Sequence, residues 1–122
     1  MKIAITATGE TLDSQVDPRF GRASWFIVVD SDSMEFEAVA NDNVNAAGGA
    51  GISSAKVVID AGSEAVLTGN CGPNAHRSLA AGGVKIYTGA SGTVKEAVEK
   101  FKSGELTPVD GPNVGSHFGT GI

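Results

Sequence analysis

The one cysteine of the chain lies in a turn whose residues could bind an anion or a soft metal. The segment Thr68–Ala75 (TGNCGPNA) follows the apolar run Ala65–Leu67 and precedes a stretch with helical spacing. This order predicts a strand, a tight turn and a helix, with Pro73 at the first helical position and Gly72 as the N-cap. Free N–H groups and the helix dipole at such a terminus attract anions and lower the pKa of a nearby thiol. Cys71 could therefore bind a metal, or it could equally be a small buried apolar residue.

Composition and charge limit the classes of protein to which the chain can belong. Its 122 residues suffice for one domain, and 41% hydrophobic and 19% charged residues are typical of a globular protein. A net charge of −5 argues against a nucleic-acid surface, which needs a basic patch. No apolar run is long enough to span a bilayer, and one cysteine cannot form an internal disulfide. We therefore expect a cytoplasmic protein that binds neither nucleic acid nor a membrane.

Apolar periodicity predicts five strands and three helices around the cysteine turn. The expected strands are 2–8, 25–30, 34–40, 65–68 and 84–88, and the expected helices are 52–59, 73–81 and 94–101. A capping box over Thr93–Glu96 marks the start of the last helix. Residues 9–22 and 41–51 are expected to be loops. A domain of residues 1–106 is then followed by a glycine-rich, flexible C-terminal tail of residues 107–122.

The order of these elements predicts how the sheet is assembled. The first three strands form an antiparallel meander, and the last two follow helical crossovers, which join parallel strands. If the fourth strand pairs with the first, the order is 3-2-1-4-5 in a three-layer α/β domain. One edge of the sheet then gathers two helix N-termini, the cysteine, Arg19, Arg22 and the loops that contain Gly9, Gly69 and Gly89. The topology therefore predicts an anion site at this edge.

Three motifs, in this order, resemble those of one known family. DPRFGRA (Asp17–Ala23) precedes an apolar strand, GAGI (Gly49–Ile52) opens the first helix, and TGNCGPNA (Thr68–Ala75) opens the second. Together they resemble the dinitrogenase iron–molybdenum cofactor family, which includes small carriers of nitrogenase cofactor precursors and an orange-coloured protein that holds a molybdenum–copper sulfide cluster. The resemblance implies a ribonuclease H-like fold. It also implies non-covalent binding of an anionic metal–sulfur cluster, of molybdenum–copper, iron–molybdenum or iron–sulfur type, rather than catalysis.

The first motif departs from the pattern of the nitrogenase-specific relatives. Those relatives often carry His-Phe-Gly, whose histidine is a candidate metal ligand, whereas this chain has Arg19 at the matching position. Arginine cannot ligate a metal, but its guanidinium can pair with a sulfide or oxyanion charge. The departure supports cluster binding in general and weakens the specific expectation of an iron–molybdenum cofactor carrier. The small length and the Asn70–Gly72 turn look more like the uncharacterised or orange-protein side of the family. Phe20, which follows Arg19, is expected to anchor the loop to the core.

The topology and the resemblance together give the expected site. The candidate cofactor-binding residues are Gly9, Arg19, Arg22, Gly49, Gly51, Gly69, Asn70, Cys71, Gly72 and Asn74, and the candidate metal ligands are Cys71 and His76. Arg19 and Arg22 could equally be solvated charges paired with Asp13 or Asp17. His76 could be incidental, because a lone histidine on a helix is often not a ligand.

The function expected from this reasoning is non-catalytic binding, storage or transfer of an anionic metal–sulfur cluster. We expect a monomer that exchanges the cluster with donor and acceptor proteins. His117 could offer an imidazole to the cluster, but an unstructured terminus is the favoured interpretation of this segment. The alternative is a metal-free regulatory or scaffold module on the same fold. Three further classes are disfavoured. A ribonuclease H-type nuclease needs a carboxylate that the first expected strand lacks, and a cysteine-nucleophile enzyme needs a third group to orient Cys71 and His76, which the sequence does not offer. A nucleotide-binding module has no Walker A sequence to support it.

Overall fold

The computed structural model describes residues 1–41 and 50–109. Its elements are β1 (Lys2–Ala7), η1 (Phe20–Arg22), β2 (Trp25–Asp30), β3 (Phe36–Ala40), α1 (Ala50–Asp60), β4 (Ala65–Leu67), α2 (Pro73–Ala81), β5 (Lys85–Tyr87) and α3 (Val94–Lys102). Every expected strand and helix is present, and only the 3-10 turn η1 was not expected. Within the described residues, no helix has the length and apolar character needed to cross a membrane.

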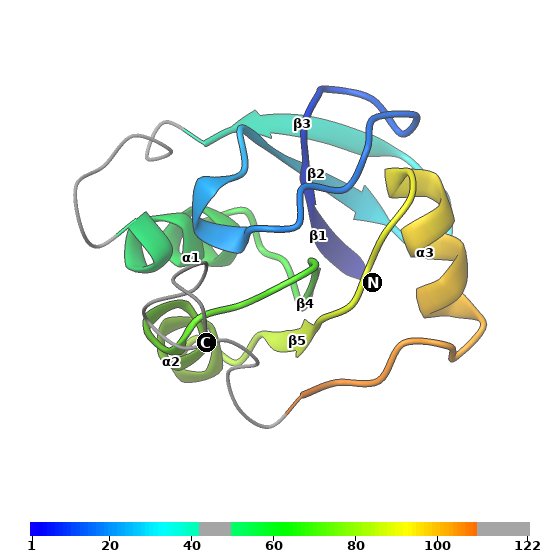
Figure 1. Ribbon diagram of the computed structural model, residues 1–122. Helices are drawn as coiled ribbons and strands as arrows, with labels where there is room; N and C mark the ends of the chain where they lie inside the picture. The colour runs from blue at the N-terminus through cyan, green and yellow to red at the C-terminus, as the bar shows by residue number, and fades with distance from the viewer. Residues whose placement is uncertain (42–49, 110–122) are drawn as a thin grey trace, which may run out of the picture.

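The five strands form one mixed sheet in the order β3-β2-β1-β4-β5, which confirms the predicted order (Figure 1). β1 pairs antiparallel with β2, where Ala4 lies opposite Val28, and parallel with β4, where Ala4 lies opposite Val66. β4 and β5 are parallel as well. Because α1 leads into β4 and α2 connects β4 to β5, both helices run opposite to these strands and start where the strands end. The ribonuclease H-like label of the fold stays a prediction.

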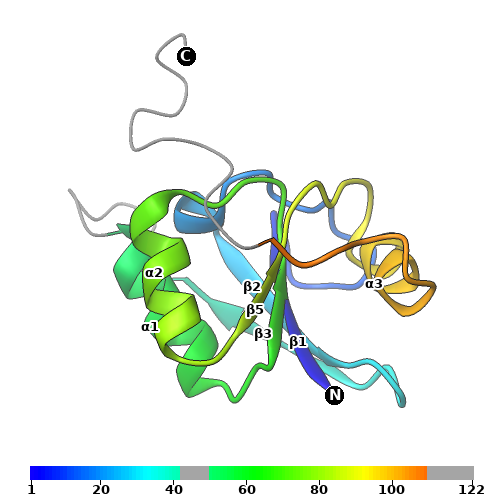
Figure 2. The same ribbon diagram turned by 90° about the horizontal axis from the view of Figure 1, so that it is seen from below.

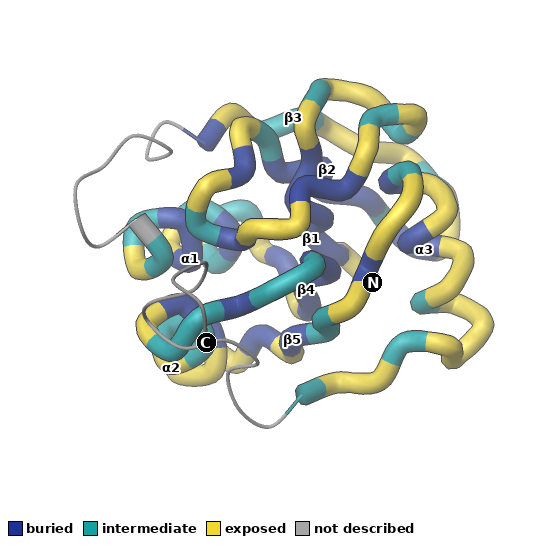
Figure 3. The backbone as a smooth tube through the Cα atoms, in the orientation of Figure 1, coloured by how far each residue is buried: buried dark blue, intermediate teal, exposed yellow. Residues whose placement is uncertain are grey.

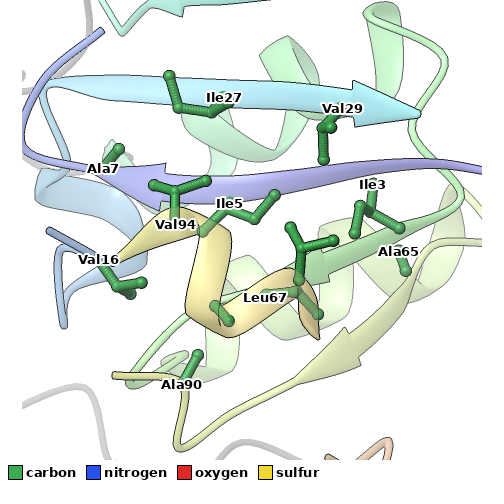
Figure 4. Packing of buried hydrophobic residues seen from close by; sticks show 12 residues of the cluster. Ile3, Ile5, Ala7, Val16, Ile27, Val29, Ala65, Leu67, Ala90 and Val94 are labelled. Atoms are coloured by element: carbon green, nitrogen blue, oxygen red, sulfur yellow. The ribbon is translucent and has the colours of Figure 1, made fainter. Parts of the chain in front are cut away.

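Two buried clusters hold the layers together, one on each face of the sheet. α1 and α2 cover one face and α3 covers the other (Figure 2). Since neighbouring side chains of a strand point to opposite faces, Ile3 and Ile5 of β1 pack with Val94 in the α3 cluster (Figure 4), whereas Ala4 packs with Leu79 in the α1–α2 cluster. β1 is therefore buried on both sides and forms the rigid centre of the domain.

The strand at the β3 edge of the sheet is shorter and more exposed than the sequence suggests. Asp30 Oδ1 accepts hydrogen bonds from Asp32 N (2.8 Å) and Ser33 N (3.2 Å), and Met34 takes a positive φ of 64°. This turn delays the start of β3 to Phe36, whereas the expected strand began at Met34. The strand carries no fully buried residue, in contrast to the buried interiors of β1 and β2 (Figure 3).

The strand at the other edge, β5, is covered by the first residues of the predicted tail. Pro108 forms an antiparallel bridge with Tyr87, and Val109 N donates to Ile86 O (2.8 Å). The chain over residues 107–109 is thus attached to the sheet rather than separate from it. The rest of the predicted tail, residues 110–122 with His117, lies outside the described residues.

Candidate functional site

Three loops meet at the edge of the sheet where β1, β4 and β5 end (Figure 1). These loops comprise residues 8–24, 68–72 and 88–93. Residues 17–24 carry Arg19 and Arg22 and are called the arginine loop below. Gly89 N donates to Gly69 O (3.0 Å), which joins the second loop to the third. The shared edge is the one at which the topology predicts an anion site.

The arginine loop lies directly against the turn that leads into α2. Asn70 Nδ2 donates to Pro18 O (3.2 Å), and Phe20 N donates to Asn70 O (3.2 Å). Asn70 therefore fixes the backbone on both sides of Arg19. The contact is close enough to require glycine at position 69, because a Cβ there would lie 2.7 Å from Pro18 Cα and 2.8 Å from Pro18 O.

Phe20 anchors the arginine loop in the core, as the sequence predicted. Its side chain is 2% exposed, and its ring centroid lies 5.5 Å from that of Phe26. The same buried cluster contains Cys71 and Ala75 at the start of α2. Burial of this aromatic ring holds the exposed arginine side chains close to the helix entry.

The N-termini of α1 and α2 lie side by side at this edge. A Cβ at Gly51 in α1 would lie 3.2 Å from the Cβ of Ala75 in α2, so the two first turns touch. Neither first turn carries an acidic residue. Gly72 is the N-cap of α2 and makes no side-chain capping bond, and Pro73 follows it, as predicted. Two positive helix ends therefore adjoin without a carboxylate on either of them.

The exposed charges of the arginine loop are positive in a chain that is acidic overall, and one buried carboxylate, Asp17, accompanies them. No Asp or Glu occurs between Glu64 and Glu96. Arg19 and Arg22 are both exposed. Arg19 Nε lies 3.8 Å from Asp17 Oδ1, so the predicted alternative of an Asp17 partner is present in the structure. The Arg19 side chain is nevertheless 56% exposed, so it remains accessible to a ligand.

Cys71 is not the activated thiol that the sequence suggested. Its side chain is buried, with 1% of the residue exposed, and burial raises the pKa of the thiol to about 11. The prediction that the helix N-terminus lowers this pKa is wrong, because the loss of water around the sulfur outweighs the dipole. Sγ lies 3.8 Å from Gly72 O. A protonated thiol at neutral pH is a poor ligand in this conformation.

The metal-ligating side chains that the structure describes near this edge do not form a group that could hold a cluster directly. Among residues 1–41 and 50–109, no three His, Cys, Asp or Glu side chains lie close enough together to hold a metal ion. His76 lies in the first turn of α2 and is half-buried, but it completes no such group. A cage of protein ligands therefore does not fit these residues. An anion held by N–H groups and guanidinium groups does fit them, because it needs charge and donors rather than metal ligands.

Comparison with known proteins identifies the family to which the chain belongs. Residues 1–104 match the sequence model of the family described as dinitrogenase iron-molybdenum cofactor. The chain belongs to this family. Its match covers all the elements described above and ends just before the residues that cover the edge of β5.

The relatives of this dinitrogenase cofactor family protein include solved structures with the same fold. The apo form of the orange protein of Desulfovibrio gigas is 43% identical and has a TM-score of 0.90, over 93% of this chain and 96% of that one. A Thermotoga protein provisionally assigned as NifB is 37% identical, with a TM-score of 0.77 over 88% and 91% of the two chains. An uncharacterized protein of Methanocaldococcus jannaschii is 28% identical over 87% of this chain and 89% of its own length.

The structure brings most of the predicted site residues of this family member to one edge. Those at the loop contact or at the adjoining helix ends are Arg19, Arg22, Gly51, Gly69, Asn70, Cys71, Gly72, Asn74 and His76. Gly9 differs from them: a Cβ there would lie 2.6 Å from Ser14 Oγ, so this glycine serves a tight turn within its own loop. Gly49 lies outside the described residues. Whether the other candidates bind a cluster stays a prediction.

Sequence reasoning missed the buried polar residues beneath the edge. Thr6 Oγ1 donates to Asp17 O (2.7 Å) and shares a hydrogen bond of 2.9 Å with the Thr68 hydroxyl. Asn41 Nδ2 donates to Ala23 O (2.8 Å). The one sequence signal was Thr6 within an apolar strand. Threonine is common in strands, so its presence did not indicate a buried hydrogen-bond network.

Proposed function

We propose that this protein is a non-catalytic carrier that binds, stores or transfers an anionic metal–sulfur cluster. The observation that supports the proposal best is the pair of adjoining helix N-termini, which lack acidic residues and lie beside the arginine loop. This arrangement concentrates positive potential on an otherwise acidic protein, and an anion of matching size would neutralise it. Family membership directs the choice of anion toward a cofactor precursor or cluster.

The chemistry of the site favours a cluster held without protein ligands. Backbone N–H groups of α1 and α2 and the guanidinium groups of Arg19 and Arg22 would bind sulfide or oxyanion charge from outside the cluster. Direct ligation by Cys71 would require its thiol to lose both its burial and its proton. The 43% identity to the orange protein supports the orange-protein side of the family, for which the sequence motifs imply a molybdenum–copper sulfide cluster rather than an iron–molybdenum one. Donor and acceptor proteins, a monomeric state and a cytoplasmic location belong to the same proposal.

A cluster titration tests the proposal. Purified protein is mixed with tetrathiomolybdate and copper(I), and separately with an iron–sulfur precursor, under reducing and oxygen-free conditions. We expect a coloured species that elutes with the protein on gel filtration at a fixed metal content. Arg19→Ala and Arg22→Ala should each weaken binding by about fivefold, or about 1 kcal/mol. Metal that elutes only with the small molecules would contradict the proposal.

A charge-matched control separates a site from general attraction. Lys100 is exposed in the last turn of α3, on the other face of the sheet and away from the loop edge. Lys100→Ala changes the net charge by the same amount as the two arginine variants. We expect this variant to bind the cluster as the wild type does. An equal loss of affinity in Lys100→Ala would show that the protein attracts the anion without a specific site.

A metal-free regulatory or scaffold module on the same fold is the second candidate. Two observations favour it: the protonated state of Cys71 and the lack of a three-ligand group within the described residues. Full binding of a protein partner by cluster-free protein would support this candidate. The ribonuclease H-like classification is compatible with either function. Nuclease activity is not proposed, because β1 contains no Asp or Glu to hold a catalytic metal.

A further inference from the structure

The buried polar residues of the described chain gather around one loop. These residues are Thr6, Asp17, Ser31, Asn41, Ser54, Ser63 and Thr68. All except Ser31 and Ser63 belong to the arginine loop or are hydrogen-bonded to it, directly or through one another. Burial of a polar group is unfavourable unless it is hydrogen-bonded, and a satisfied network fixes a single conformation. The network therefore restricts the arginine loop more than packing alone would.

Two of these residues fix the backbone on both sides of Arg22. Asn41 Nδ2 donates to Ala23 O (2.8 Å) and to Ser54 Oγ (3.1 Å). The Ser54 hydroxyl lies 3.4 Å from Gly21 O, at the long end of hydrogen-bond range. The carbonyl groups before and after Arg22 are thereby tied to Ser54 of α1 and to Asn41 at the end of β3. The Gly21 carbonyl lies in the peptide plane that directly precedes Arg22, and the Ala23 carbonyl lies one peptide beyond it, so the two contacts restrain the backbone that carries the Arg22 side chain.

The other arginine has an equivalent support from a different element. Asn70, in the turn before α2, is hydrogen-bonded to Pro18 O and to Phe20 N and so fixes both sides of Arg19. Each arginine is thus held to one of the two adjoining helices, Arg22 to α1 and Arg19 to the entry of α2. The two supports share no side chain, so their effects can be separated by mutation.

We infer that Asn41 and Ser54 are positioning residues that orient Arg22 toward the anion at the N-termini of α1 and α2. The inference rests on the proposed function for its ligand. It predicts that Asn41 and Ser54 contribute to affinity only through Arg22. Asn70 acts in the same way on Arg19, which changes its role from the ligand contact that the sequence suggested to a support of the loop.

A double-mutant cycle with tetrathiomolybdate and copper(I) as the probe tests this inference. Asn41→Ala and the milder Ser54→Ala are each combined with Arg22→Ala and, separately, with Arg19→Ala. Each single variant should weaken probe affinity by about twofold to fivefold, because a residue that acts only through Arg22 cannot cost more affinity than Arg22→Ala itself. Neither should weaken it further when Arg22 is already alanine, whereas both should retain their full effect when Arg19 is alanine.

Ser63→Ala is the matched control for Ser54→Ala. Ser63 is also buried, and its Oγ makes no hydrogen bond within the described part of the protein. This variant should leave probe affinity unchanged. Equal losses for Asn41→Ala in the Arg22→Ala and Arg19→Ala backgrounds would overturn the inference, since they would indicate a general loosening of the loop.

Amide hydrogen exchange distinguishes failure of this inference from failure of the proposed function. Exchange in residues 20–24 should be faster in Ser54→Ala and unchanged in Ser63→Ala, with or without the probe. If the wild-type protein binds no probe, the proposed function fails. Faster exchange confined to residues 20–24 would then still support the positioning role, and unchanged exchange would overturn it.

Discussion

The N-termini of α2 and α3 are built in two different ways. At α3, Thr93 Oγ1 accepts a hydrogen bond from Glu96 N (3.1 Å), and Glu96 Oε1 accepts one from Thr93 N (2.9 Å). At α2, Gly72 provides no side chain and Pro73 no N–H, and the first turn has no acidic residue. The α3 terminus thus satisfies its own positive end, whereas the α2 terminus leaves its N–H groups to another partner.

The difference shows that capping and ligand binding compete for the same atoms. Sequence preference favours Ser, Thr, Asp or Asn at an N-cap, because such a residue stabilises a helix by about 1 kcal/mol relative to alanine and by a few tenths of a kcal/mol relative to glycine. A cap on α2 would occupy the N–H groups that an anion needs. The uncapped terminus of α2 is therefore less stable, but its N–H groups are available to an anion. The capped terminus of α3 serves as the internal reference for experiments on α2.

Gly69→Ala should have the largest effect on the α2 side of this comparison. Its Cβ would collide with the backbone of Pro18, so the arginine loop would have to move away from the entry of α2. We expect a loss of about 1–3 kcal/mol in the free energy of unfolding, measured by urea denaturation, together with loss of tetrathiomolybdate binding. Gly72→Ala is the control, because a Cβ at Gly72 meets no atom within 4 Å. Similar losses in both variants would refute the steric explanation.

Gly72→Asp should convert the α2 terminus into one that resembles α3. An aspartate N-cap should raise the free energy of unfolding by up to about 1 kcal/mol, and it should weaken anion binding by about tenfold through its charge. Thermal unfolding and probe titration measure the two effects. Gly72→Asn separates them, because asparagine caps the helix without a charge. If Gly72→Asp leaves affinity unchanged, the anion does not bind at this helix end.

Thr93→Ala should produce the reverse pattern at α3. Loss of the Oγ1 acceptor leaves Glu96 N without its cap and should reduce the free energy of unfolding by about 1 kcal/mol. The variant should bind tetrathiomolybdate as the wild type does, because no part of the proposed site lies on α3. A clear loss of affinity would mean that all three helix ends act as one site.

Local signals were sufficient to predict the elements that carry the site. Glycine and proline at positions 72 and 73 located the start of α2, and Thr93 with Glu96 located the start of α3. The strand order followed from connection rules that use only the order of elements. These features depend on residues close in sequence or on the order of the elements, so the sequence alone was sufficient to predict them.

The details of the site depend on contacts that the sequence does not show. Asn70 and Pro18 are hydrogen-bonded although they are 52 positions apart. The pKa of Cys71 is raised because the folded chain buries its sulfur. The sequence showed only that Cys71 precedes a helix, whose dipole would lower this pKa. Residues with site-like chemistry were therefore found from the sequence, but their division into ligand contacts and supports required the fold.

The smallest expected effect is a pH dependence that belongs to α3 alone. Hydrogen bonds from the backbone N–H and the side chain of Thr93 lower the pKa of Glu96 below its usual value. A lowered folded-state pKa stabilises the protein at pH values above the unfolded pKa, and this contribution is lost as the pH falls through the folded pKa. Glu96→Gln can keep the capping bond but cannot titrate.

The difference in unfolding free energy between wild type and Glu96→Gln should therefore be larger at pH 7 than at about pH 3, near or below the usual glutamate pKa. Urea denaturation of both proteins at the two pH values measures it, and the titration of Asp30, whose pKa is also lowered, cancels in the difference. Anion affinity should be equal in the two proteins at pH 7. A constant stability difference would mean that the Glu96 charge adds nothing to the cap, and that α3 differs from α2 only in its hydrogen bonds.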